Sequence, residues 1–280
     1  MPSWHPHPDV LLVIAMLGAG YTLLARRVGP KLVHPIERPV TRNQATAFGG
    51  GLAVLFVASY WPIHDIAEGY LYSAHMIQHM LLTLIAPPLL LIGTPAWMLR
   101  YILGDRGIKI AKFLGRPLIG LIAFNAMIAI SHIPAVVEWA ATSEPFHFGA
   151  HVLLIGTAFM MWSPVLNPLI ELPKLSYPAR MFYLFLQSLV PTVPASFLTF
   201  GHTVLYDVYE RGPGMWGISA ISDQRVAGLI MKIVGGLIIW TVIAWYFFKW
   251  YKVEESEKVD VLEWSKLERA AAQPKTTELV

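Results

Sequence analysis

Long apolar runs separated by short polar segments dominate the chain. A helix of about 20 apolar residues is long enough to cross the hydrocarbon core of a bilayer. Seven such candidate helices cover residues 10–28, 46–63, 71–92, 118–139, 148–170, 181–201 and 227–250. Prolines interrupt the fourth to sixth runs, and we interpret them as kinks, because neighbouring helices can satisfy the carbonyls that proline leaves free. The pattern predicts an all-α integral membrane protein, folded as a seven-transmembrane helix bundle.

The chain divides into two parts by polarity. Residues 1–251 contain all seven apolar runs and form the predicted membrane domain. Residues 252–280 mix acidic and basic side chains without a long apolar run, so we expect a solvated, partly disordered polar tail.

The distribution of basic residues predicts the orientation of the bundle. Lysine and arginine gather in one set of loops, at 26–42, 100–116 and 174–180, and again after residue 249, whereas the opposite set holds only Arg211 and Arg225. Loops rich in lysine and arginine usually remain in the cytoplasm. The amino terminus is therefore expected outside, and the carboxyl terminus in the cytoplasm.

Composition supports a membrane protein and excludes several kinds of chemistry. The 280 residues are 55% hydrophobic and 14% charged, far below the quarter that is usual in soluble domains. The net charge of +3 reflects the basic loops, so we expect no nucleic-acid partner. The absence of cysteine excludes disulfides, thiolate metal sites and catalytic thiols within this chain.

The third apolar run opens with a group of candidate metal ligands. In a helix, His75 and His79 lie four residues apart and share one face, and Met76 and Met80 share the adjacent strip. Imidazole binds copper, zinc and iron, and the thioether sulfur of methionine suits Cu(I). This segment alone is equally compatible with two histidines hydrogen-bonded to their neighbours.

A second histidine pair strengthens the metal hypothesis. His147 and His151 are also four residues apart, near the outer end of the fifth apolar run, and His132 lies near the outer end of the fourth. Nine of the ten histidines map to the outer ends of the helices or beyond them, and His34 is the exception. Polar groups within a bilayer usually face the bundle interior. We therefore predict a metal or haem site with His75, His79, His147 and His151 as ligands and Met76, Met80 and His132 as further candidates, although His147 also suits an interfacial position.

Three other polar side chains are candidates for orienting the ligands. Asp223 either caps its own helix or accepts a hydrogen bond from a metal-bound imidazole. Gln224 and Gln78 are further candidates for orienting a metal-bound imidazole. Lys232 lies about two turns deeper than Asp223 and requires a partner that the sequence does not identify.

The motifs resemble those of a known family. The segment from His75 to Leu82, followed by Ala86 to Pro95, resembles the signature of the multi-span CtaG family of caa-type cytochrome c oxidase assembly factors, and Asp223-Gln224 with residues 227–231 resembles its last-helix motif. The resemblance implies a bacterial plasma-membrane protein, with oxidase subunits as partners, that helps to mature the oxidase without catalytic turnover. It also implies copper as a transient cargo, delivered to a centre near the outer side.

Other functions remain open at this stage. A haem protein could use one histidine from each helix as an axial ligand. A membrane zinc hydrolase could use three of the histidines, although no glutamate accompanies the pairs as it does in HExxH enzymes. A metal-free assembly scaffold would use the histidines for packing alone.

Overall fold

The computed structural model describes residues 6–212 and 215–272, and every regular element in these ranges is a helix. This confirms the predicted all-α class. Five helices are long and apolar enough to cross a membrane, and the number rises to as many as seven if each of two bent helix pairs forms one span. The prediction of seven spans corresponds to the upper limit, and the orientation of the termini stays a prediction.

The first half of the chain contains three long passages and their connections. The elements are α1 (Pro8–Leu23), the π-helix η1 (Leu24–Val28), α2 (Gly29–Leu32), α3 (Arg42–Ser59), α4 (Ile63–Gly69), α5 (Tyr72–Met80), the π-helix η2 (Leu81–Ile85), α6 (Ala86–Gly93) and α7 (Ala96–Leu114). The passage from Tyr72 to Gly93 is the most deeply buried of the candidate spans.

The second half completes the bundle. Its elements are α8 (Pro117–Ser131), α9 (Pro134–Thr142), α10 (Glu144–Leu166), α11 (Tyr177–Leu189), α12 (Thr192–Phe200), α13 (Asp207–Arg211), α14 (Ala220–Leu229), the π-helix η3 (Ile230–Val234) and α15 (Gly235–Ala272). Helix α10 packs against α8, α11 against α15, and α14 against α5.

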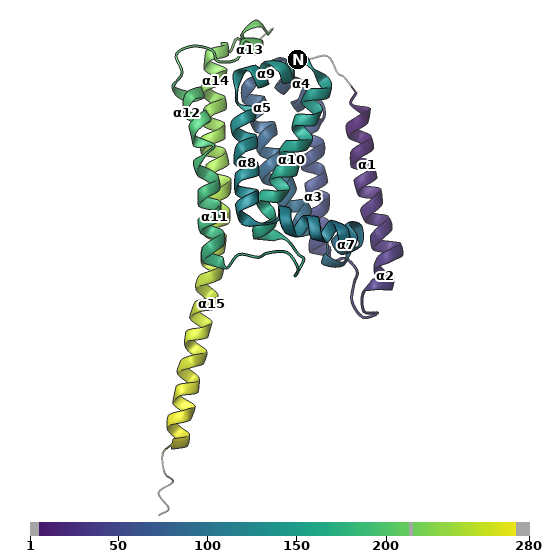
Figure 1. Ribbon diagram of the computed structural model, residues 1–280, viewed down its shortest axis with the longest axis vertical. Coiled ribbons are helices and arrows are strands. Elements are labelled where there is room, and N and C mark those ends of the chain that lie inside the picture. The colour runs from purple at the N-terminus through teal and green to yellow at the C-terminus, as the bar shows by residue number, and fades with distance from the viewer. Residues whose placement is uncertain (1–5, 213–214, 273–280) are drawn as a thin grey trace, which may run out of the picture.

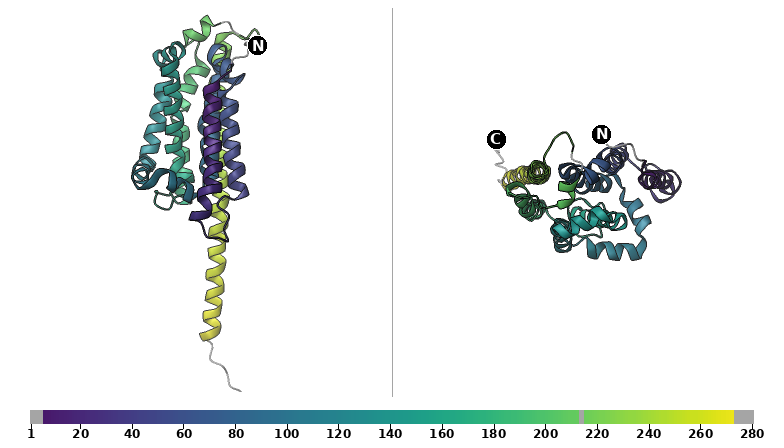
Figure 2. Two further views of the ribbon diagram at one scale, coloured as in Figure 1. Left: turned by 90° about the vertical axis from the view of Figure 1, so that its right-hand side faces the viewer. Right: turned by 90° about the horizontal axis from the view of Figure 1, so that it is seen from above.

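The long helices run side by side, and short helices close one end of the bundle (Figure 1). Helices α4, α9 and α13 lie at this end, which we call the capped end, and α7 lies across the opposite end. Seen from above, α1 lies at the periphery (Figure 2). It has no buried residue and packs mainly on α3, so it adds little to the core.

Several helix boundaries differ from the predicted ones. The predicted helix 118–139 is broken after Ser131, because a residue before proline avoids the helical conformation and Ile133 precedes Pro134. Helix α10 ends at Leu166, so Pro168 lies beyond it instead of kinking it. The last helix continues to Ala272, past the predicted start of a disordered tail at residue 252, and residues 273–280 lie outside the described residues.

The core joins α5 and its continuation to the surrounding helices. Tyr72, Met76, Met80 and Leu84 line the buried side of this passage. A π-helix departs from the α-helical hydrogen-bond pattern, and within η2 the Thr83 carbonyl accepts a hydrogen bond from the Trp162 indole N–H at 2.9 Å. This contact connects the irregular turn to α10, the helix that carries the second histidine pair.

Candidate functional site

The first turn of α5 is held by a carboxylate from another helix. Asp223 of α14 is 3% exposed, and its oxygens accept hydrogen bonds from the backbone N–H groups of Tyr72 at 2.6 Å and Ser73 at 3.2 Å. The Ser73 hydroxyl donates to the same carboxylate. The first N–H groups of a helix have no partner within it, so Asp223 serves as their cap from a distance of 150 residues or more in sequence.

Four imidazoles meet below this cap. The rings of His75 and His79 on α5 lie 4.1 Å apart between centroids, and those of His147 and His151 on α10 lie 4.3 Å apart. The His151 ring is 6.3 Å from His75 and 5.7 Å from His79. The structure thus brings both predicted pairs into one group, which we call the imidazole cluster.

Three members of the imidazole cluster contain a buried nitrogen atom without a hydrogen-bond partner among the described residues. These atoms are Nδ1 of His75, Nδ1 of His79 and Nε2 of His151. Buried polar atoms in folded proteins are nearly always paired. Three exceptions within one cluster indicate a place where imidazole nitrogens are available to bind an external group such as a metal ion.

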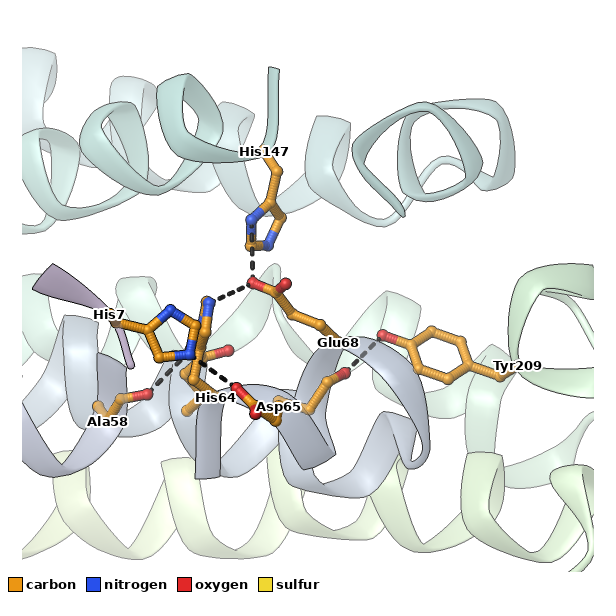
Figure 3. A network of polar contacts seen from close by, with 9 residues as sticks. His7, Ala58, His64, Asp65, Glu68, His147 and Tyr209 are labelled. Carbon is orange, nitrogen blue, oxygen red and sulfur yellow. Dashed lines mark hydrogen bonds and ion pairs between the residues drawn. The ribbon is translucent and has the colours of Figure 1, made fainter. Parts of the chain in front are cut away.

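Glu68 orients the fourth member. Its Oε1 atom lies 3.1 Å from His147 Nδ1 and 2.9 Å from His64 Nε2 (Figure 3). When the Glu68 carboxylate accepts a hydrogen bond from the Nδ1–H of His147, the free lone pair of this ring is on Nε2 of His147. This pairing of a carboxylate with a histidine is usual where histidine binds metal, since it fixes the tautomer and the ring orientation.

Gln78 fixes the tautomer of His64. Its amide nitrogen donates to the carbonyl of Ala58 at 2.9 Å and lies 3.1 Å from His64 Nδ1. An amide N–H can only donate, so His64 Nδ1 accepts and its Nε2–H points to Glu68. Gln78 therefore contacts His64, which was not among the predicted ligands, and its role beside a ligating imidazole stays a prediction.

The group around α4 was not predicted from the sequence. His7 Nε2 lies 2.8 Å from Asp65 Oδ1, and the His7 ring is 4.6 Å from that of His64 (Figure 3). The spacing of His64 and Glu68, four residues apart within α4, is the sequence signal that could have identified this group. It is the same spacing that identified both histidine pairs.

His132 also has one nitrogen fixed and one free. It follows the last residue of α8 at the capped end, its Nδ1 lies 2.7 Å from the Ile128 carbonyl, and its buried Nε2 has no partner within the described residues. The Tyr206 hydroxyl donates to the His132 carbonyl at 3.0 Å. Burial raises the pKa of Tyr206, which keeps the phenol neutral and able to donate.

The remaining candidates have structural contacts. Met76 and Met80 are 1% and 8% exposed and belong to the hydrophobic core. Gln224 accepts from the Leu205 N–H at 2.7 Å and donates to the Thr203 carbonyl at 3.3 Å. Asp223 and Gln224 were predicted to orient an imidazole, but the contacts described for them hold the start of α5 and the loop after α12, because both side chains point into junctions between helices.

The imidazole nitrogens of the site are near one another but do not point at a common centre. In the part of the chain that the structure describes, no group of three or more His, Asp or Glu side chains has the arrangement of a formed metal site. The role of the imidazole cluster as a ligand set therefore stays a prediction.

Comparison with known proteins identifies the family. The sequence model described as "Cytochrome c oxidase caa3 assembly factor (Caa3_CtaG)" matches residues 19–253, which include every helix of the bundle in whole or in part. No curated protein and no solved structure shows significant similarity to the chain. The matched region contains the imidazole cluster, the Asp223 cap and Lys232. The chain therefore belongs to the cytochrome c oxidase caa3 assembly factor family.

Proposed function

We propose that this protein holds copper at the imidazole cluster and passes it to an oxidase subunit during assembly. The observation that carries the proposal is the meeting of four imidazoles from two helices, three of which contain an unpartnered buried nitrogen. Copper is the cargo in this scheme, and the protein carries out no catalytic turnover. Membership of an oxidase assembly family supports an oxidase subunit as the recipient.

The donor set suits a metal that must be released. Imidazole nitrogen binds copper in both oxidation states, whereas a closed thiolate cage cannot form in a chain without cysteine. His75, His79 and His151 would supply nitrogen ligands, and Glu68 keeps the Nε2 atom of His147 available as a fourth. Because the donors do not converge, copper binding requires the rings to turn about their side-chain torsions.

The position of the cluster agrees with delivery at the outer surface. Both histidine pairs lie within the first eight residues of α5 and α10, and these helices begin at the capped end, opposite α7 (Figure 1). Helix α7 contains most of the basic segment at 100–116, which the positive-inside rule assigns to the cytoplasm. On this assignment the capped end faces outward, where an oxidase subunit can receive the ion by ligand exchange.

Metal analysis of the purified protein tests the proposal. The detergent-solubilised wild type, a His75→Ala/His79→Ala double variant and a His34→Ala control are loaded with Cu(I) under reducing conditions. His34 is exposed and lies between α2 and α3, so its removal leaves the imidazole cluster unchanged. We expect copper in the wild type and the control and its loss in the double variant.

The same samples distinguish the other functions. A Soret band in the absorption spectrum would identify a haem protein, and retention of zinc in place of copper would support a zinc site. No metal in any sample, or equal copper in the double variant, would overturn the proposal and leave a scaffold role. In cells, the double variant should leave the oxidase deficient in copper while its protein subunits accumulate.

A further inference from the structure

Lys232 places an ammonium group deep within the last membrane span. It lies in η3, 12 residues after the start of α14 at Ala220, which is about 18 Å along a helix axis. At the other end of the span, the Lys249 ammonium lies against the rings of Tyr177 and Trp245, about 25 Å below Lys232. Lys232 is therefore too far from both ends for its side chain to reach either interface. A charge at this depth is costly unless it has a partner.

The described part of the chain provides no anion for this lysine. Lys232 is exposed, and it has no hydrogen-bond or ion-pair partner among residues 6–212 and 215–272. Asp223 is the single acidic residue between Ala220 and Lys249, and its carboxylate is buried against the start of α5, nine residues before Lys232. The partner of Lys232 must therefore come from another molecule.

A second unpaired donor, the amide of Gln187, lines the same hollow as Lys232. Lys232 and Gln187 line one hollow with a volume of about 50 Å³, together with Ser188 and Thr192, near the break between α11 and α12. Gln187 is 2% exposed, its carbonyl accepts from Asn125 at 2.7 Å, and its amide nitrogen has no acceptor among the described residues. An ammonium and an amide N–H that share one hollow match the two oxygens of a carboxylate.

The surface around the hollow fits a helix. Gly236 lines the hollow one turn after Lys232, and a Cβ atom added there would meet nothing within 4 Å. Small residues allow two membrane helices to approach closely. Leu229, Ile233 and Leu237 form a neighbouring row along the same helix and are 42%, 53% and 63% exposed, so they offer apolar contacts next to Gly236.

We infer that this hollow receives a transmembrane helix of a different protein that carries an aspartate or glutamate near its middle. The carboxylate would accept hydrogen bonds from the Lys232 ammonium and the Gln187 amide, and Gly236 would admit the helix backbone. A second copy of this chain does not meet the requirement through its last span, because the Asp223 carboxylate is already bound. The inference is independent of copper and of the imidazole cluster.

Peptide binding in vesicles tests the inference. The full-length protein, labelled with a fluorescent donor, is reconstituted in phosphatidylcholine vesicles with an acceptor-labelled host helix of about 20 leucine and alanine residues. The helix carries either glutamate or glutamine at its centre. Energy transfer should show that the glutamate helix binds the wild type about tenfold more tightly than the glutamine helix.

Matched variants separate charge from packing. Lys232→Met should abolish the preference for glutamate, Lys232→Arg should retain it, and Lys249→Met should leave it unchanged. Gly236→Leu should weaken binding of both helices. Equal binding of the two helices by the wild type, or a preference that persists in Lys232→Met, would overturn the inference. Loss of the preference on addition of phosphatidylglycerol would also overturn it, since a lipid headgroup would then be the occupant.

Discussion

Asp223 accepts a hydrogen bond from the backbone N–H of Tyr72 at 2.6 Å, although the two residues are 151 positions apart. The Tyr72 ring in turn lies parallel to that of His75, with 5.7 Å between their centroids. The start of the last membrane passage therefore determines where the first histidine of the cluster lies. This connection explains how a residue without an imidazole contact can still affect the site.

Replacement of this carboxylate should destabilise the protein. Asp223→Ala leaves the N–H groups of Tyr72 and Ser73 buried and unpaired, at a cost of about 1–3 kcal/mol. We expect a lower thermal transition in detergent and reduced copper stoichiometry. Asp223→Asn retains an acceptor oxygen and should lose less stability. The exposed Ser222→Ala is the control, and an unchanged transition in Asp223→Ala would contradict the capping role.

Glu68→Gln should weaken copper binding without unfolding the protein. The substitution removes the charge that orients the His147 ring, and loss of such a partner typically lowers metal affinity by about 10- to 100-fold. Competition with a Cu(I) chelator measures the affinity. Glu138→Gln is the matched control, because Glu138 binds Arg211 and the Val208 N–H at the same end of the bundle. Equal affinities in the two variants would contradict a role for Glu68 in orienting a ligand.

Gly228 is a position where the bundle tolerates no larger side chain. A Cβ atom there would lie 2.4 Å from the Thr199 hydroxyl oxygen and 2.7 Å from the Ala195 carbonyl oxygen, where α14 meets α12. Gly228→Ala should reduce the free energy of unfolding by about 1–3 kcal/mol through overpacking. Gly149→Ala, at a site with no atom within 4 Å, should change it far less. Denaturation in mixed micelles provides the comparison, and similar losses in both variants would contradict this explanation.

Tyr209 should make stability depend on pH in the alkaline range. Its hydroxyl donates to the Ala67 carbonyl at 3.0 Å (Figure 3), and burial raises its pKa well above the ordinary value of 10.0. The unfolded chain therefore releases this proton first, so the contribution of Tyr209 is complete below pH 10 and declines as the pH rises further. Tyr209→Phe should lose about 1 kcal/mol near neutral pH. It should also show a shallower alkaline decline than the wild type, and parallel pH profiles would contradict the assignment.

The histidine pairs could be predicted because their geometry is local. Residues four apart in a helix share a face, and the alternation of apolar runs placed both pairs near the same end of the bundle. In the structure the α5 and α10 pairs lie close together. Their role as copper ligands is the part that only the metal experiment tests.

The contacts that support the cluster could not be predicted because they are tertiary. Local rules assign Asp223 to the first turn of its own helix, but which other helix its carboxylate reaches depends on how α14 packs on α5. The same holds for Glu68, which contacts His147 only because α4 lies beside the start of α10. The segment at 100–116 was predicted as a basic loop, yet it lies largely within α7, since a surface helix needs no uninterrupted apolar run.

The π-helix η2 sets the angular register of the histidines. A π turn contains an additional residue, so the two halves of this passage are rotated against each other by about 100° compared with an uninterrupted α-helix. The lower half, α6, packs against α3, while the upper half presents its imidazoles to α10. Deletion of one residue from Leu81–Ile85 would leave the helix apolar but would turn His75 and His79 away from His151. The direction in which the histidines point therefore depends on the length of this segment by a single residue.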